Sequence, residues 1–359
     1  MTTLAQTATD LGGWTHNLSP IALQITQGFA IRWYGLSYLA GFAAAYLLLR
    51  FLASRHATRI PGERALDAIL TLVVGVVVGG RLGYVFLYDP SLLRFESSFP
   101  FWGVLAINRG GMASHGGILG VVIAAWKISR GFKTESGDIV ARYPPLHAMD
   151  VCAMIAPAGL FFGRVANFIN GELLGKIVAA PAQPAPWWAV RYPQEIISEP
   201  PNRLPHTAEQ WDAIRRLSLE YALPSEGWGD GYERLVAAIQ RGDQIATDAL
   251  TPLLTARYPT QLMQAALDGL LVGIVVWVVA IKPRKPGIIG AWFLITYALG
   301  RIAMDFVRLP DAGIAQFGGI TRGQLYSALM LVIGTATLIV ISRSNAERIS
   351  GGWLRRQPA

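Results

Sequence analysis

Long apolar stretches fill this 359-residue sequence and restrict it to folds that a lipid bilayer can surround. A helix needs about 20 mainly apolar residues to cross the roughly 30 Å hydrocarbon core. Only 15% of the residues are charged, whereas an ordinary soluble domain carries about a quarter. The pattern predicts an all-α polytopic membrane protein with seven transmembrane helices, at 31–52, 66–88, 116–128, 146–170, 262–281, 288–308 and 322–342.

Lysine and arginine residues follow every second predicted span. The positive-inside rule places such basic connections on the cytoplasmic side of the membrane. The N-terminus is therefore expected outside and the C-terminus inside, with 343–359 as a basic cytoplasmic tail. Because this topology accounts for the net charge of +8, no nucleic acid is expected as a partner.

One membrane-embedded domain is expected over 1–359, divided by a long insert. Spans one to four with their motifs occupy 31–175, the insert 176–257, and spans five to seven 258–342. Loops longer than about 60 residues are translocated to the outer side of the membrane largely regardless of their charge, so the insert is assigned outside. Within it, Thr207 to Tyr221 predicts an amphipathic helix with a capping box formed by Thr207 and Gln210.

Glycine patterns mark places where the chain is expected to pack closely. Gly75, Gly79 and Gly83 are spaced for close contact between helices. The Gly-rich, aromatic segment 99–117 precedes the short third span and is expected to be a partly buried re-entrant segment. The single cysteine, Cys152, lies in an apolar run, which indicates a packing role and excludes an internal disulfide framework.

Ionisable residues inside the spans are the main candidates for function, because burying a charge in a bilayer is costly. A rise of ~1.5 Å per residue places His115, Arg301 and Arg164 about 18, 22 and 27 Å from the cytoplasmic edge, respectively. This depth predicts an anion-handling chamber in the outer half of the bilayer. The intramembrane set comprises Arg81, His115, Asp150, Arg164, Arg301, Asp305 and Arg308.

The sixth span places Tyr297, Arg301, Asp305 and Arg308 at spacings of four, four and three, which puts them on one helix face. Arg301, beside a tyrosine, is the expected ligand-binding member. Two structural alternatives stay open for the others. Asp305 would neutralise the arginines, and Arg308 would extend to the outer interface.

The fourth span places Arg164 and Asn167 on one face, where a guanidinium fork suits a phosphate group. Asn170 has the alternative of hydrogen bonding between helices. His115 is a candidate general base, with a structural hydrogen-bonding role as its alternative. Ser114 lacks the Gly-x-Ser-x-Gly elbow of a nucleophile. The carboxylates are too scattered for a metal cage, so neither a metal nor another cofactor is expected.

Six runs together resemble the prolipoprotein diacylglyceryl transferase family of bacterial inner membranes. The runs GGMASHGG and GRVANFINGELLG are the most specific of them. Departures from the family pattern are Ala166, Asp305 and the pair Met263 and Gln264, and the insert is longer than usual. The matching stretches are RWYGLSYLAG (32–41), GGRLGYVFLYDP (79–90), GGMASHGGILGV (110–121), GRVANFINGELLG (163–175), RYPTQLMQA (257–265) and GRIAMDFVRLPD (300–311).

The resemblance implies a multi-pass enzyme of the bacterial inner membrane with its active site toward the periplasmic half. It would transfer the diacylglyceryl group of phosphatidylglycerol to the lipobox cysteine of a preprolipoprotein signal peptide, forming a thioether and releasing glycerol phosphate. It implies catalytic residues Tyr34, His115, Arg164, Tyr297 and Arg301, and lipid-binding residues Asp150, Arg164, Asn167, Glu172, Gly175, Arg301, Asp305 and Arg308. An alternative function is a membrane transporter or lipid-binding protein for an anionic substrate, although the repeated halves of such transporters are not found.

Overall fold

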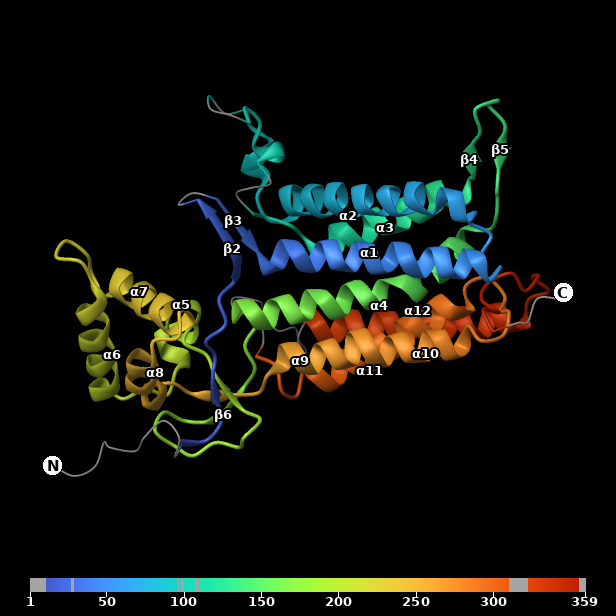
Figure 1. The fold of residues 1–359 in the computed structure, drawn as a ribbon. Coiled ribbons are helices and arrows are strands. Elements are labelled where there is room, and N and C mark those ends of the chain that lie inside the picture. Colours follow the sequence, from blue (N-terminus) through green and yellow to red (C-terminus); the bar gives the residue numbers. More distant parts are fainter. Residues whose placement is uncertain are drawn as a thin grey trace. The chain divides into compact units, whose positions relative to one another are not determined.

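The computed structural model describes residues 11–26, 29–95, 97, 100–106, 110–309 and 322–354. Most of these residues are helical (Figure 1). The helices are α1 (Trp33–Ser54), α2 (Ala65–Leu87), α3 (Ser114–Ser129), α4 (Pro145–Asn170), α5 (Glu195–Ser198), α6 (Ala208–Tyr221), α7 (Trp228–Gln240), α8 (Gln244–Leu250), α9 (Thr260–Gln264), α10 (Val272–Val279), α11 (Ile288–Met304) and α12 (Arg322–Arg343).

Five helical segments are long and apolar enough to cross a membrane. They match the first, second, fourth, fifth and seventh predicted spans. The third and sixth predicted spans correspond to shorter apolar helices, at His115–Ser129 and Ile288–Met304. The structure is thus that of a polytopic membrane protein, while the count of seven crossings stays a prediction. The five segments are Trp33–Ser54, Gly62–Leu87, Pro145–Asn170, Thr260–Val279 and Gly323–Arg343.

Contacts divide the chain into two compact units. The first unit comprises Met1–Leu39, Leu160–Gly269 and Leu299–Ser327, and the second comprises Ala40–Gly159, Leu270–Ala298 and Ala328–Ala359. In the second unit, an apolar core forms where α1, α2 and α4 bury Leu49, Ile69 and Met154.

Within the second unit, α2 and α3 lie side by side along a seam of glycines (Figure 1). A Cβ added at Gly75 would lie 2.6 Å from the Gly120 carbonyl oxygen, and one at Gly83 would lie 2.7 Å from the Gly116 Cα. No larger residue fits this seam without separating the helices. The close packing predicted from the spacing of Gly75, Gly79 and Gly83 is therefore confirmed.

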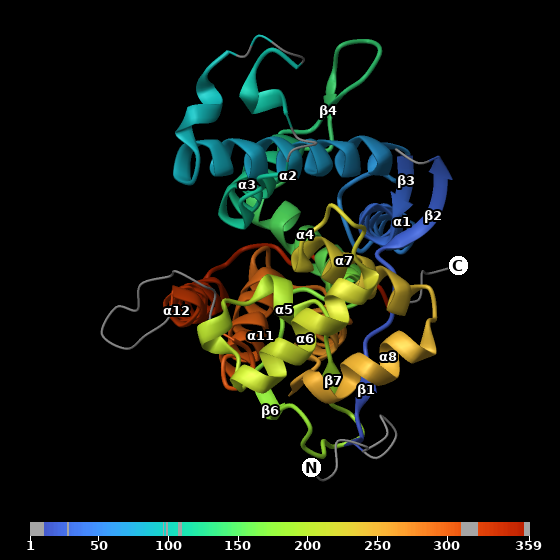
Figure 2. The same ribbon diagram turned by 90° about the vertical axis from the view of Figure 1, so that its left-hand side faces the viewer.

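The insert folds as part of the first unit, where α6, α7 and α8 pack together (Figure 2). Their shared core buries Ile214, Tyr232 and Leu250. The expected capping box is confirmed, because the Thr207 and Gln210 side chains each accept a hydrogen bond from the other residue's backbone N–H. These contacts make the insert a packed subdomain with its own apolar centre.

A small sheet corrects the expectation of an all-α fold. Its strand order is β1, β7, β8, β6, with β1 parallel to β7 and the other pairs antiparallel. The sheet joins segments far apart in the chain, a pairing that apolar periodicity does not reveal. Two hairpins, β2 with β3 and β4 with β5, complete the set. The strands are β1 (Trp14–Thr15), β2 (Ile21–Thr26), β3 (Phe29–Arg32), β4 (Phe132–Lys133), β5 (Ile139–Val140), β6 (Ile177–Ala179), β7 (Val190–Arg191) and β8 (Ala256–Arg257).

The two central strands end in the same tripeptide, Arg-Tyr-Pro, at 191–193 and 257–259. The two copies have different surroundings. Tyr192 is buried and donates a hydrogen bond to the Gln261 side chain at 3.1 Å, whereas Tyr258 stacks on Trp188 with ring centroids 5.2 Å apart. The antiparallel pairing of β7 and β8 places Arg191, which begins the first copy, opposite Ala256, and Arg257, which begins the second, opposite Val190. The second copy leads into α9.

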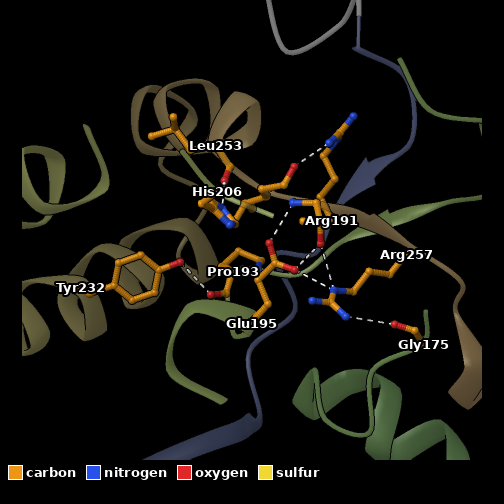
Figure 3. A network of polar contacts seen from close by, with 10 residues as sticks. Gly175, Arg191, Pro193, Glu195, His206, Tyr232, Leu253 and Arg257 are labelled. Atoms are coloured by element: carbon orange, nitrogen blue, oxygen red, sulfur yellow. Dashed lines mark hydrogen bonds and ion pairs between the residues drawn. The ribbon is translucent and has the colours of Figure 1, made fainter. Parts of the chain in front are cut away.

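A buried ion pair ties the start of α5 to β8, near the end of the insert (Figure 3). The Glu195 carboxylate accepts a hydrogen bond from the Arg257 Nε at 2.6 Å, and both side chains are at most 1% exposed. The same carboxylate accepts hydrogen bonds from the backbone and hydroxyl of Thr255. A charge buried in this way stabilises the fold only while its partner is present, because the lone charge would lack both water and a counter-ion.

Candidate functional site

Eight of the predicted site residues lie in the first unit, on the ends of α1, α4 and α11 and on the segments that follow α4 and α11. The helices therefore bring together residues that are up to 274 positions apart in the chain. These residues are Tyr34, Arg164, Asn167, Glu172, Gly175, Arg301, Asp305 and Arg308.

Tyr34, Asn167 and Glu172 form one group. Tyr34 lies in the first turn of α1, and its side chain interacts with those of Asn167 and Tyr38. The Asn167 Nδ2 donates a hydrogen bond of 2.5 Å to the Glu172 carboxylate. Because α4 ends at Asn170, the chain turns back and the Glu172 backbone N–H donates to the Asn167 carbonyl. The group presents a phenol, an amide and a carboxylate, which suit the hydroxyls of a polyol headgroup.

Arg164 faces a carboxylate that the sequence analysis did not single out. Its Nε lies 3.5 Å from the Oδ2 of Asp268, a fully buried residue of the π-helix Ala265–Leu271 between α9 and α10. Asp268 also interacts electrostatically with Arg301 and Arg308. The cost of an intramembrane charge would have identified Asp268, since it lies within the predicted span 262–281.

Arg301 is held by a residue in the turn directly after its own helix. Its Nη1 donates a hydrogen bond of 2.6 Å to the Asp305 Oδ1, and both side chains are mostly buried. This contact agrees with the structural alternative for Asp305. The other Asp305 oxygen accepts no hydrogen bond from the part of the chain that the structure describes.

The expectation that Arg308 shares the helix face of Arg301 is wrong. Helix α11 ends at Met304, and Arg308 lies beyond a turn, where its backbone forms an isolated bridge with Gly175. The Lys176 side chain caps this turn by donating to the carbonyls of Asp305 and Phe306. Arg308 therefore lies beside the segment that follows α4.

Gly175 connects the site with the buried ion pair of the insert. Its carbonyl accepts a hydrogen bond from the Arg257 Nη1 at 3.1 Å (Figure 3). A Cβ at Gly175 would collide with the Tyr258 carbonyl and lie 2.8 Å from the Thr260 side chain. The absence of a side chain thus lets two backbone segments approach each other, and we infer a structural reason for glycine at this position.

His16 also lies in the first unit but is not a candidate base. It is fully buried and donates a hydrogen bond from Nε2 to the Phe168 carbonyl at 2.7 Å. Burial lowers the pKa of His16 to about 4, so the ring is neutral at pH 7. This hydrogen bond anchors the last turns of α4 at Phe168, one residue after Asn167 and two before Asn170.

His115, Asp150 and Tyr297 belong to the second unit. His115 is exposed in the first turn of α3. Tyr297 stacks on Phe293 with ring centroids 5.9 Å apart. Both Asp150 oxygens accept backbone hydrogen bonds, from Gly287 at 2.7 Å and Gly290 at 2.8 Å, so this carboxylate caps the start of α11. Substrate binding by Asp150 stays a prediction.

Arg81 has a structural role that its position in a span did not reveal. Its guanidinium donates to the carbonyls of Gly103, Val104 and Ala106 and to those of Gly110 and Gly111. The side chain is 4% exposed and holds together the irregular segment that precedes His115. The part of 99–117 that the structure describes is irregular before α3, apart from a short 3₁₀ turn at Gly103–Leu105.

Across the described ranges, no group of three or more His, Cys, Asp or Glu side chains is arranged to hold a metal ion. The cluster in the first unit instead combines three guanidinium groups, of Arg164, Arg301 and Arg308, with two carboxylates, of Asp268 and Asp305. Such a cluster suits an anionic ligand that makes directional hydrogen bonds to arginine.

This chain is similar to known proteins along most of its length. The family model for prolipoprotein diacylglyceryl transferase matches residues 20–340. This chain belongs to that family. Relatives called phosphatidylglycerol–prolipoprotein diacylglyceryl transferase include one from Bdellovibrio bacteriovorus, 40% identical over 95% of this chain and 97% of the relative. Another, from Stenotrophomonas maltophilia, is 35% identical over 92% of this chain and 94% of its own length.

Membership of the prolipoprotein diacylglyceryl transferase family extends over both units, since the matched residues include parts of each. The match also spans the insert. The resemblance first drawn from six short runs is thereby confirmed.

Proposed function

We propose that this chain transfers the diacylglyceryl group of phosphatidylglycerol to the thiol of the lipobox cysteine of a preprolipoprotein, the first step of bacterial lipoprotein maturation. The observation that carries the proposal is the cluster of Arg164, Arg301 and Arg308 at the ends of membrane helices. Family membership gives the reaction, and the cluster supplies the cations that a phosphate headgroup needs.

In this reaction the cysteine sulfur attacks the glycerol carbon that carries the phosphate. A carbon–sulfur bond forms, the carbon–oxygen bond breaks, and glycerol phosphate leaves with the bond electrons. Negative charge develops on the leaving phosphate, and guanidinium groups fixed in a site of low dielectric stabilise that charge. Arg164 and Arg301 take this role, while Tyr34, Asn167 and Tyr297 orient the headgroup.

The thiol must lose its proton, because a thiol of pKa near 8.5 is weakly ionised at pH 7. His115 accepts this proton in our proposal. Replacing it by glutamine, which keeps polarity but cannot accept a proton at neutral pH, is expected to reduce turnover by about 100-fold. Near-normal turnover of His115→Gln would contradict the assignment and leave the substrate phosphate as the acceptor.

All seven apolar helices cross the bacterial inner membrane in this proposal, with the N-terminus and insert in the periplasm and the C-terminus in the cytoplasm. Support comes from the basic connections after alternate spans. The active site then lies in the periplasmic half, where the signal peptide and the outer-leaflet headgroups are accessible.

The decisive experiment is mass spectrometry of a synthetic lipobox peptide after incubation with the purified full-length protein and phosphatidylglycerol vesicles. We expect a mass gain equal to one diacylglyceryl group on sulfur, together with free glycerol phosphate. An Ala-for-Cys peptide is the control and should stay unmodified. If the cysteine peptide also stays unmodified while lipid moves between leaflets, the chain is a transporter instead.

A further inference from the structure

Asp268 is a fully buried carboxylate in a helix that is apolar enough to span the membrane. Neither of its oxygens accepts a hydrogen bond of good geometry from a described residue. A buried charge without hydrogen bonds destabilises a protein unless nearby charges compensate it. The compensating groups here are Arg164, Arg301 and Arg308, so the carboxylate belongs to the arginine cluster.

The contact between Asp268 and Arg164 uses one particular edge of the guanidinium. Asp268 Oδ2 lies 3.5 Å from Nε, and no described residue forms a hydrogen bond with either terminal nitrogen, Nη1 or Nη2. The edge formed by these two nitrogens is the one that binds a phosphate group through two parallel hydrogen bonds. The Arg164 side chain is 20% exposed, whereas Asp268 is not exposed at all. The carboxylate therefore lies behind the arginine, on its buried side.

Backbone contacts fix both partners. Gly269 follows Asp268, and a Cβ there would lie 2.6 Å from the Phe161 Cβ. Phe161 precedes Arg164 by about one turn of α4, so the two helices touch beside the ion pair. The π-helix that carries Asp268 has a wider turn than an α-helix, a distortion that is frequent at functional sites.

We propose that Asp268 is a positioning residue for Arg164, holding its Nε so that Nη1 and Nη2 face the phosphate of the bound lipid. The inference rests on the proposed function. Asp305 acts differently, because it contacts an Nη of Arg301 and lies in the turn directly after the same helix. Arg164 is thus fixed from another helix, and its phosphate-binding edge stays open.

The test separates positioning from lipid binding. Asp268→Asn keeps the shape of the side chain and removes its charge. We expect kcat to fall by up to about 100-fold, because a small misplacement of a group that acts in the transition state has effects of that size. The Kd for phosphatidylglycerol, measured by native mass spectrometry, should stay the same or decrease, since one negative charge near an anionic ligand is gone. Asp268→Glu should recover most of kcat.

The matched control is Asp67→Asn, which breaks another ion pair of aspartate with arginine, that of Asp67 in the first turn of α2 with Arg64 just before it, at 3.1 Å. It should leave kcat and Kd unchanged. Unchanged kcat in Asp268→Asn, or equal losses in kcat and lipid binding, would overturn the assignment.

If Asp268→Asn yields no folded protein, the double variant Arg164→Gln/Asp268→Asn decides the question. Removing both charges restores folding if the two groups are a pair, and a double variant that also fails to fold overturns the assignment. A wild-type protein that leaves the peptide unmodified refutes the proposed function instead. An active wild type with an equally active Asp268→Asn variant refutes only the role of Asp268.

Discussion

Arg164 illustrates why the chemistry of one side chain matters at this site. Its guanidinium is planar and has two usable edges, one toward Asp268 and one without a partner among the described residues. A lysine has one point charge and cannot serve a carboxylate and a phosphate along two fixed directions. The residue type is therefore set by geometry as well as by charge.

Arg164→Lys is expected to lower kcat/KM for lipobox peptide and phosphatidylglycerol by about 100-fold or more, because lysine keeps the charge but loses the directed pair of hydrogen bonds that stabilises the leaving phosphate in the transition state. The assay is the rate of peptide modification followed by mass spectrometry. The control is Arg215→Lys, a change at an exposed arginine of α6, which should have no effect. Equal rates for the Arg164 variant and wild type would show that only its positive charge matters.

The sequence revealed individual site residues where they carried an evident cost. Arg164 and Arg301 stood out as charges in apolar runs, and both lie in the cluster. Asp268 carries the same cost and was missed, although its surroundings are equally apolar. Arg81 carries the cost too, but its five carbonyl partners come from an irregular segment whose path no local pattern predicts. A charged residue in an apolar run is thus a candidate site residue, but the sequence does not show whether its role is functional or structural.

Single elements differ in how far local sequence determines them. Helix α4 begins and ends within one residue of the prediction, because its apolar run is continuous. Helix α11 ends four residues before the predicted end of span six, because the chain turns at Asp305 to pair with Gly175. The four-stranded sheet was not predicted, since its two-residue strands exist only through partners distant in sequence.

The ion pair of Glu195 and Arg257 connects the insert with the candidate site, because Arg257 also donates a hydrogen bond to the Gly175 carbonyl. Glu195→Gln is expected to reduce the stability of the first unit by about 3 kcal/mol, because it leaves the arginine charge buried without a counter-ion. Hydrogen exchange of the full-length protein in detergent should show faster exchange in 175–179 and 189–195, the segments that pack around Arg257.

The matched control lies in the same insert. Glu226→Gln removes the exposed ion pair of Glu226 and Arg234, which water and salt screen. It should leave exchange in the sheet unchanged. If the two variants gave the same exchange pattern, the buried pair would not support the sheet.

At the scale of the whole molecule, the side of the membrane on which each end lies is predicted from the basic residues of the sequence. The fold by itself does not determine this orientation. The single native cysteine makes it measurable. In a Cys152→Ala background, Glu209→Cys in α6 is expected to react with a membrane-impermeant maleimide in intact spheroplasts. Asn345→Cys, just after α12, should react only after the membrane is permeabilised. Labelling of Asn345→Cys in intact spheroplasts would reverse the assigned topology.

The glycine seam of α2 and α3 also sets how this stretch of sequence can drift during evolution. At Gly75, Gly79 and Gly83, every substitution adds atoms where the backbone of α3 already lies. One residue before the first two of these positions, Val74 and Val78 point away from the seam and are about half exposed, where a bilayer accepts any apolar side chain. Neighbouring positions on one helix are therefore constrained differently. The seam positions accept only glycine, whereas the positions just before them accept any apolar residue, and this alternation repeats about once per helical turn.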